Sequence, residues 1–247
     1  MSFFENTRKP EGLGGKVMVS MMNLGHNALA NWGFQFLSVV KDAVVLDCGC
    51  GGGANLEKLL QKCPNGQVNG IDYSEVSVEK SRNVNRKAIE AGRCEVLRAS
   101  VMELPFENEQ FDAVTAFETV YFWPDLAQSF REVWRILKPG GTFFICNECS
   151  GDTDKDAKWT EIIDGMTIYK DAQLKAVLEE AGFQNVQINK NGKGWLCVTA
   201  RKREKIENCR RIPDKHIDIV GKMEYHAGIK RPNKKEGADL LCPESAR

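Results

Sequence analysis

Short apolar runs alternate with longer amphipathic segments from about Ala43 to Arg201. The short runs have the length and composition of buried strands, and the longer segments repeat apolar residues at helical spacing. Such alternation is typical of β-α units that build a parallel sheet. We therefore predict an α/β domain over residues 43–201, with helices on both faces of a doubly wound sheet.

Seven strands and four main helices follow from this pattern. The predicted strands are residues 44–46, 68–72, 94–99, 111–117, 142–147, 186–189 and 195–200. The predicted helices are residues 56–63, 76–90, 126–137 and 174–181, with Ser74 and Asp171 as possible caps of the second and fourth. Asn191-Gly192 joins the last two strands and suits a tight hairpin turn. The sheet is thus expected to be mostly parallel and to end in an antiparallel hairpin.

Two segments flank this domain. We expect residues 17–40 to form an amphipathic helix that covers the carboxyl edge of the sheet as a cap. Its apolar positions are Leu29, Trp32, Phe36, Leu37 and Val40. The segment from about Lys202 is rich in charged residues and is expected to be peripheral or partly disordered. The organisation is therefore a helical cap (1–42), a main domain (43–201) and a charged tail (202–247).

Charge and hydropathy limit the kinds of binding partner that we expect. Lys plus Arg and Asp plus Glu are equal at 34 each, so no overall field favours nucleic acid or an anionic membrane. No stretch reaches the roughly 18 apolar residues of a membrane span, and residues 1–16 lack the apolar centre of a signal peptide. We expect a cytoplasmic protein with no membrane partner. No oligomeric state follows from the sequence.

Cysteine is frequent, with nine residues in the chain. Six of them fall among apolar residues of predicted strands and helices and are expected to be reduced, buried thiols: Cys48, Cys50, Cys63, Cys94, Cys146 and Cys197. Cys146 and Cys149 have the spacing of a metal or redox pair, but no second pair accompanies them. We therefore predict no metal site.

A glycine loop is the strongest chemical signal. Gly49 to Ala54 fits the pattern G-x-G-x-x-G/A and stands between a predicted strand and a predicted helix. Glycine permits a tight turn and close approach of a ligand, and the following helix presents unpaired amides. Asp72 ends the next strand, where a carboxylate can bind ribose hydroxyls. These residues predict a nucleoside-bearing ligand and leave NAD and S-adenosylmethionine both open.

Val44 to Gly53 resembles the first motif of class I S-adenosylmethionine-dependent methyltransferases, in which an acidic residue precedes the first glycine by two. Asp47 stands at that position. Later matches follow in the family's order over residues 44–201. They are Ile71-Asp72-Tyr73-Ser74, Glu103-Leu104-Pro105-Phe106 with Phe111-Asp112, Leu137-Lys138-Pro139-Gly140-Gly141 and Glu180-Ala181-Gly182-Phe183.

The resemblance implies S-adenosylmethionine as cofactor and assigns residues by position. Asp47, Gly49, Cys50 and Gly51 would hold the methionine end. Asp72 would bind the ribose, Tyr73 one face of the adenine, and Ser100 with Val101 the adenine edge; the family often has Asp where Ser100 stands. Phe117 and Glu118, at the end of the fourth strand, complete the expected cofactor site.

The sequence gives fewer signals for the residues that bind the methyl acceptor. The Asn/Asp-Pro-Pro-Tyr/Phe motif typical of relatives that methylate amino groups of DNA bases is missing after Phe117, so nucleic acid is not the favoured substrate. His26, Tyr121 and Tyr169 are candidate catalytic residues, and Glu148 is a weaker one. A dedicated base is needed only when the nucleophile arrives protonated.

The sequence therefore favours methyl transfer to a small molecule or metabolite. Alternatives are a protein that binds S-adenosylmethionine without catalysis, and a methyltransferase that acts on a macromolecule. An NAD-dependent oxidoreductase is disfavoured by Asp47 and by the terminal hairpin.

Overall fold

The computed structural model describes residues 12, 14, 15 and 27–204. The chain divides into two units, Met1–Ile206 and Glu207–Arg247, and all described residues belong to the first. His26 and most of the predicted charged tail lie outside the described residues. Lys202, where that tail was expected to begin, is instead the buried last residue of the final strand.

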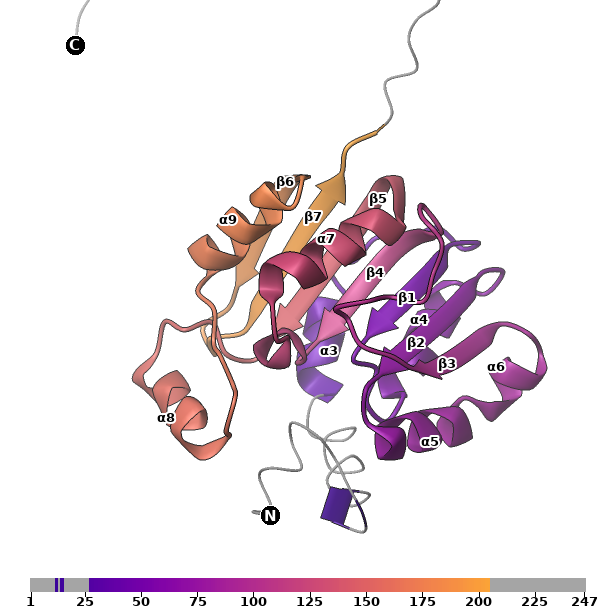
Figure 1. The fold of residues 1–247 in the computed structure, drawn as a ribbon, viewed down its shortest axis with the longest axis horizontal. Coiled ribbons are helices and arrows are strands. Elements are labelled where there is room, and N and C mark those ends of the chain that lie inside the picture. The colour runs from indigo at the N-terminus through magenta and orange to yellow at the C-terminus, as the bar shows by residue number, and fades with distance from the viewer. Residues whose placement is uncertain (1–11, 13, 16–26, 205–247) are drawn as a thin grey trace, which may run out of the picture. The chain divides into compact units, whose positions relative to one another are not determined.

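One seven-stranded sheet forms the centre of the domain (Figure 1). Its strands are β1 (Val44–Cys48), β2 (Gln67–Asp72), β3 (Cys94–Arg98), β4 (Phe111–Phe117), β5 (Leu137–Asn147), β6 (Phe183–Lys190) and β7 (Leu196–Lys202). Their order is β3-β2-β1-β4-β5-β7-β6. The first five strands pair in parallel, and β7 pairs antiparallel with both β5 and β6. The predicted fold class and terminal hairpin are confirmed.

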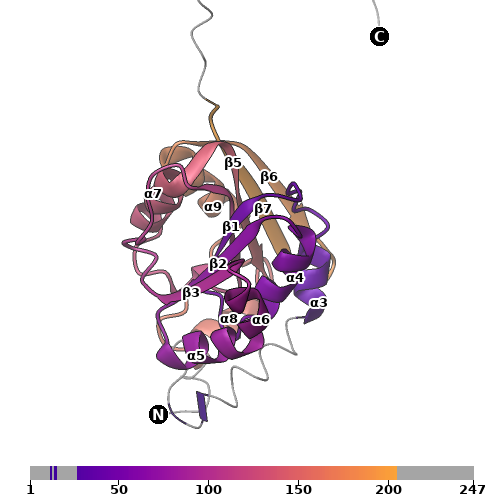
Figure 2. The ribbon, with the colours of Figure 1, turned by 90° about the vertical axis from the view of Figure 1, so that its right-hand side faces the viewer.

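Helices cover both faces of the sheet. The α-helices are α3 (Asn27–Gly33), α4 (Ala54–Lys62), α5 (Glu75–Val84), α6 (Arg86–Glu90), α7 (Leu126–Ile136), α8 (Asp154–Ile162) and α9 (Asp171–Glu180), and η1 (Val120–Phe122) is a 3-10 turn. Figure 2 shows α3 and α4 on one side and α7 and α9 on the other. Each side has its own core of buried apolar residues, as the alternation along doubly covered strands requires.

The predicted helix over residues 76–90 is broken. Ser74 caps α5 as expected, accepting a hydrogen bond from the Ser77 amide at 3.4 Å. The helix then ends at Val84, because buried Asn85 turns inward and its side-chain amide donates to the carbonyl oxygens of Gly53 and Ser81, each at 3.0 Å. The break therefore fastens the end of the glycine loop to α5.

Two predictions are wrong: Asp171 as the cap of the last helix, and Asn191-Gly192 as a two-residue turn. Asp171 is the first residue of α9, whose N-cap is Lys170. The hairpin between β6 and β7 is not a two-residue Asn191-Gly192 turn but a connection over residues 191–195. Asn191 closes it with its side chain, which accepts from the amides of Lys193 and Trp195, and the left-handed residue is Gly194 (φ 87°).

The predicted N-terminal cap differs in its described part. Helix α3 ends at Gly33, and residues 34–40 are not helical. Leu29, Phe34 and Leu37 pack into the core on the α4 side of the sheet. A Cβ on Gly33 would lie 2.6 Å from Cys146 Sγ, so the helix lies directly on β5. The segment thus covers a sheet face, because its apolar residues bury better there than at the polar strand ends.

Candidate functional site

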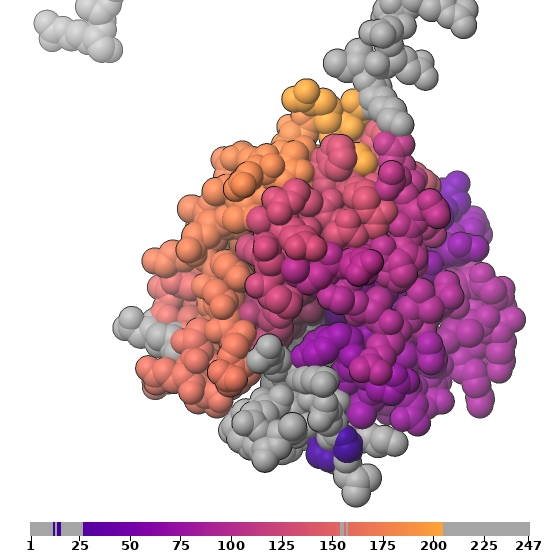
Figure 3. All heavy atoms as spheres, in the orientation of Figure 1, coloured from indigo at the N-terminus to yellow at the C-terminus, as the bar shows by residue number. Residues whose placement is uncertain are grey.

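The strand order reverses between β1 and β4. The chain passes from β1 outward to β2 and β3, then returns to place β4 on the other side of β1. In open α/β sheets, ligands bind at the carboxyl ends of the strands beside such a reversal. The surface is hollowed at this edge, between the purple atoms of the first half of the domain and the rose-to-orange atoms of the second (Figure 3).

The glycine loop bridges β1 and α4 at that edge. Gly49, Gly51 and Gly53 have φ values of 78°, 51° and 82°, in the left-handed region that favours glycine. A Cβ on Gly49 would lie 2.1 Å from Thr119 Oγ1, and one on Gly53 would lie 2.6 Å from Ser81 Oγ. A Cβ on Gly51 would meet no atom of the described residues within 4 Å. Gly49 and Gly53 thus serve packing, and Gly51 borders open space.

Asp72 lies beside this loop, as predicted from its place at the end of β2. One carboxylate oxygen accepts from the Gly51 amide at 3.0 Å, and the other accepts from the Ser74 amide at 2.8 Å. Burial raises the pKa of Asp72, and these backbone hydrogen bonds oppose the rise. A buried carboxylate is therefore held against the open side of the loop.

Asp47 lies beneath the loop, at the carboxyl end of β1. Its side chain is 1% exposed and accepts a hydrogen bond from Thr115 Oγ1 at 2.6 Å. Burial raises the pKa of Asp47 to about 7; the Thr115 hydrogen bond lowers it, and the charge of Asp72 adds to the rise. A cationic ligand group placed here would favour the ionised form.

The segment after β3 forms the next wall of the site. Tyr73 is 39% exposed just beyond β2. Ser100 is exposed, and its hydroxyl oxygen accepts from the Met102 amide at 3.2 Å. Val101, which follows it, is half-buried. All three lie on loops after neighbouring strands, as the resemblance implied.

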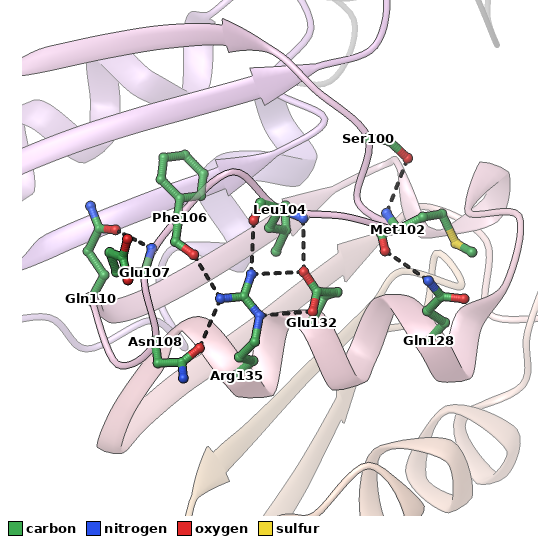
Figure 4. Close-up of polar contacts among 10 residues, drawn as sticks. All are labelled: Ser100, Met102, Leu104, Phe106, Glu107, Asn108, Gln110, Gln128, Glu132 and Arg135. Atoms are coloured by element: carbon green, nitrogen blue, oxygen red, sulfur yellow. Dashed lines mark hydrogen bonds and ion pairs between the residues drawn. The ribbon is translucent and has the colours of Figure 1, made fainter.

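Helix α7 fastens this segment to the domain (Figure 4). Arg135 donates to the carbonyl oxygens of Phe106 at 2.7 Å and Leu104 at 2.9 Å, and forms an ion pair with Glu132 at 2.9 Å. Glu132 in turn accepts from the Leu104 amide at 2.9 Å. Gln128 donates to the Met102 carbonyl at 3.0 Å. The wall containing Ser100 is thus held by three side chains of one helix.

The two predicted residues at the end of β4 have different environments. Phe117 is buried in the core, with its ring centroid 4.9 Å from that of Phe34. Glu118, which follows, has φ 59°, and its carboxyl group accepts hydrogen bonds from the Tyr121 hydroxyl at 3.3 Å and from the Glu148 amide. Burial is the main cause that raises the pKa of Glu118 to about 8. Of the two, Glu118 has the polar group at the strand end.

The candidate catalytic residues differ in placement. Tyr121 is 2% exposed, and its hydroxyl accepts from the Cys149 amide at 2.8 Å. Tyr169 is half-buried against the core on the α7 side, and burial raises its pKa. Glu148 is exposed at the end of β5. The structure thus brings Tyr121 and Glu148 next to Glu118, and Tyr169 lies on a separate segment.

Four residues of this region were missed by the sequence analysis: Asn85, Thr115, Arg135 and Asn147. Thr115 and Asn147 are the polar residues of the buried runs 113–117 and 143–147, and this is the signal that the sequence holds for them. The contacts of Asn85 and Arg135 join segments far apart in the chain and leave no local pattern.

The cysteines have no part in a described metal site. All seven described cysteines are buried and free, which confirms the six predicted thiols. Within residues 27–204, with 12, 14 and 15, no group of three or more His, Cys, Asp or Glu is arranged to hold a metal ion.

Comparison with known proteins agrees with this geometry. A family model described as "Methyltransferase domain" matches residues 46–145. Cycloartenol-C-24-methyltransferase 1 of Oryza sativa subsp. japonica is 34% identical over 116 residues, covering 47% of this chain and 33% of that protein. An O-methyltransferase of Pyrenophora dematioidea is 27% identical over 144 residues, covering 57% of this chain and 54% of that protein. The chain thus spans a third to a half of these relatives.

The fold is shared with solved methyltransferase structures. A SAM dependent methyltransferase from Aquifex aeolicus superposes with a TM-score of 0.64 at 20% identity, over 75% of this chain and 97% of that one. The matched region contains Asp47, the glycine loop and Asp72, which lie at the carboxyl ends of β1 and β2. Residues 46–145 thus match a methyltransferase domain, and the described domain has the Rossmann-like fold of solved S-adenosylmethionine-dependent methyltransferases.

Proposed function

We propose that the protein transfers a methyl group from S-adenosylmethionine to a small molecule. The observation that carries this proposal is the pairing of Asp72 with Gly51, which joins a buried carboxylate to the open side of the glycine loop. A nucleoside with two ribose hydroxyls can replace the amide contact or share the carboxylate.

The residues present fit the cofactor. Asp72 would bind the ribose, and exposed Tyr73 would stack on the adenine, with Ser100 and Val101 along its edge. Asp47 would stabilise the ammonium of the methionine end, directly or through the loop amides of Gly49 to Gly51. An ammonium near Asp47 would also offset the burial that now raises its pKa.

When bound, the cofactor supplies a methyl group made electrophilic by the positive sulfur. The protein has to hold the acceptor in line with that methyl group and to exclude water. The end of β4 lies at the strand reversal, and Glu118 and Tyr121, which follow it, are the described residues best placed for this. His26 stays a candidate from the sequence; unchanged methyl transfer in His26→Ala would remove it.

A small-molecule acceptor is supported by the relatives, which include a cycloartenol methyltransferase and an O-methyltransferase. The balanced charge of the chain gives no general attraction to nucleic acid. The acceptor atom is not set by these relatives, because their names cover both carbon and oxygen. A cytoplasmic location is our further proposal, and the buried, unpaired cysteines favour it. No helix in the described part of the chain could cross a membrane.

Calorimetric titration tests the function directly. We expect S-adenosylmethionine and S-adenosylhomocysteine to bind and NAD not to bind. Asp72→Ala should weaken binding by tenfold or more, since a hydrogen bond to a charged group contributes about 1.5–3 kcal/mol. Asp42→Ala removes an exposed carboxylate before β1, at the opposite end of the sheet, and should leave affinity unchanged. Tight binding of NAD alone would overturn the proposal.

A further inference from the structure

Glu118 occupies a strained position beside the glycine loop. Its φ of 59° is in the region that L residues rarely adopt, and such strain persists where the surrounding structure enforces it. The next residue, Thr119, packs so closely on Gly49 that a Cβ there would lie 2.1 Å from its hydroxyl oxygen. Glu118 therefore follows the central strand at the point where β4 and the loop after β1 meet.

The carboxyl group of Glu118 is held from two directions. The Glu148 amide donates to it from the end of β5, and the Tyr121 hydroxyl lies 3.3 Å from the same oxygen. Tyr121 also accepts from the Cys149 amide at 2.8 Å and has a second acceptor, the Cys149 carbonyl, at 3.4 Å. The Tyr121 hydroxyl can thus donate its proton to Glu118 when the Glu118 carboxyl group is ionised. It can donate to the Cys149 carbonyl when that carboxyl group is protonated. Glu118 can therefore change charge while the buried Tyr121 hydroxyl keeps a hydrogen-bond acceptor.

Asn147 adds an independent sign of a ligand site. It is fully buried at the end of β5, and neither its amide nitrogen nor its oxygen has a hydrogen-bond partner among the described residues. The Glu118 amide donates to the Cys146 carbonyl at 2.9 Å, so Glu118 and Asn147 lie at the same level of neighbouring strands. Buried amides are normally paired. These two strand ends therefore carry more buried hydrogen-bonding atoms than the described residues can pair.

The surroundings of Glu118 favour its neutral form. Burial raises its pKa to about 8, and the like charge of Glu148 adds to the rise. The other titratable side chains that act on it or respond to it are Tyr121, Cys146 and Cys149. At pH 7, about nine-tenths of such a group is protonated.

We propose that the Glu118 carboxyl group faces the sulfonium of the bound methyl donor and ionises when that donor binds. This inference rests on the proposed function. The donor carries a positive charge on sulfur, and its demethylated product does not. A nearby positive charge stabilises a carboxylate, so the donor releases the proton of Glu118 to solvent and the product does not.

The same group then completes the charge balance of methyl transfer. The acceptor's lone pair forms the new bond to carbon, the carbon–sulfur bond breaks, and its electron pair stays on sulfur. Glu118 takes the proton that a hydroxyl, thiol or amine acceptor loses. The carboxylate and sulfonium charges disappear together, and Glu118 returns to its neutral form beside the uncharged product. The acceptor class that fits Glu118 is therefore a nucleophile that carries a proton.

Proton release on binding tests this inference without an acceptor. S-adenosylmethionine and S-adenosylhomocysteine are titrated calorimetrically at pH 7 in phosphate and in Tris, whose ionisation enthalpies differ. We expect the donor to release roughly 0.5 to 0.9 proton more than the product, as loss of the proton from a group with a pKa near 8 requires. Between pH 7 and pH 9, donor affinity should gain up to about tenfold relative to product affinity.

Two variants separate the possible sources of the proton. Glu118→Gln should abolish the difference between the two ligands and keep product affinity within about twofold, which also shows that it folds. Asp47→Asn should lower the release common to both ligands, because both carry the ammonium group, and leave the difference intact. Equal release by the two ligands in the wild type, or a difference that survives in Glu118→Gln, overturns the inference alone. Failure of both ligands to bind overturns the proposed function and the inference with it.

Discussion

The hydroxyl of Thr115 donates a 2.6 Å hydrogen bond to the buried carboxylate of Asp47, joining the two central strands directly under the glycine loop. This bond lowers the pKa of Asp47, but burial has the larger effect and raises it to about 7. The carboxylate is thus held in place at a cost to the ligand-free protein, as is typical of groups placed for binding and not for stability.

Asp47→Asn should make the ligand-free protein less sensitive to pH. The folded pKa of Asp47 is above its ordinary value of 3.8, so its contribution to stability is present below pH 4 and is lost as the pH rises through about 7. The variant should therefore be more stable than the wild type at pH 8, by on the order of 4 kcal/mol. Calorimetric melting at pH 5 and pH 8 measures this, and equal pH dependence of the two proteins would contradict it. Cofactor affinity should fall in the same variant.

Gly51→Ala should weaken cofactor binding more than it destabilises the fold. The added Cβ meets no atom of the part of the chain that the structure describes within 4 Å, so the cost to folding is the left-handed backbone, about 1 kcal/mol. The added methyl group would, however, project from the open side of the loop. Gly92→Ala is the matched control, since Gly92 has φ 70° and open space but lies beyond α6, away from the loop. Similar melting temperatures with reduced affinity only in Gly51→Ala are expected; equal affinities would place the ligand elsewhere.

Arg135→Ala should loosen the wall that contains Ser100. It removes the hydrogen bonds to Leu104 and Phe106 and leaves Glu132 without its cation. We expect a loss of about 1–3 kcal/mol in urea unfolding and weaker binding of S-adenosylhomocysteine. Arg131→Ala changes an exposed arginine of the same helix and should alter neither. If Arg135→Ala lowers stability but leaves affinity intact, this wall does not contact the cofactor.

Tyr121→Phe should move the pH dependence of donor binding upward. The hydroxyl hydrogen bond lowers the pKa of Glu118, so its removal should raise that pKa above about 8. Stability should also fall by about 1–3 kcal/mol, because the buried Cys149 amide loses its acceptor. The measurement is the ratio of donor to product affinity between pH 6 and pH 9. Tyr169→Phe should leave this ratio unchanged, and an equal shift in both variants would argue against a specific role for Tyr121.

Much of the site followed from local sequence. The places of Asp47, the glycine loop and Asp72 were predictable because each lies next to a strand whose apolar run is visible in the chain. Glu118 was predicted by position at the end of β4. Its environment was not, because the Glu148 amide and the Tyr121 hydroxyl reach it from β5 and from η1.

The succession of strands and helices, and the places of Asp47, the glycine loop and Asp72 at strand ends, could be predicted from the sequence, because hydrophobic periodicity reports local structure. Which distant residues meet depends on the packing of the whole domain. Thr115 bonds to Asp47 across 68 residues, and the inward turn of Asn85 breaks a helix that the periodicity predicted to be continuous. Only the packing of strands β1, β4 and β5 side by side brings such groups together, and that packing places Glu118 among polar neighbours that no local pattern records.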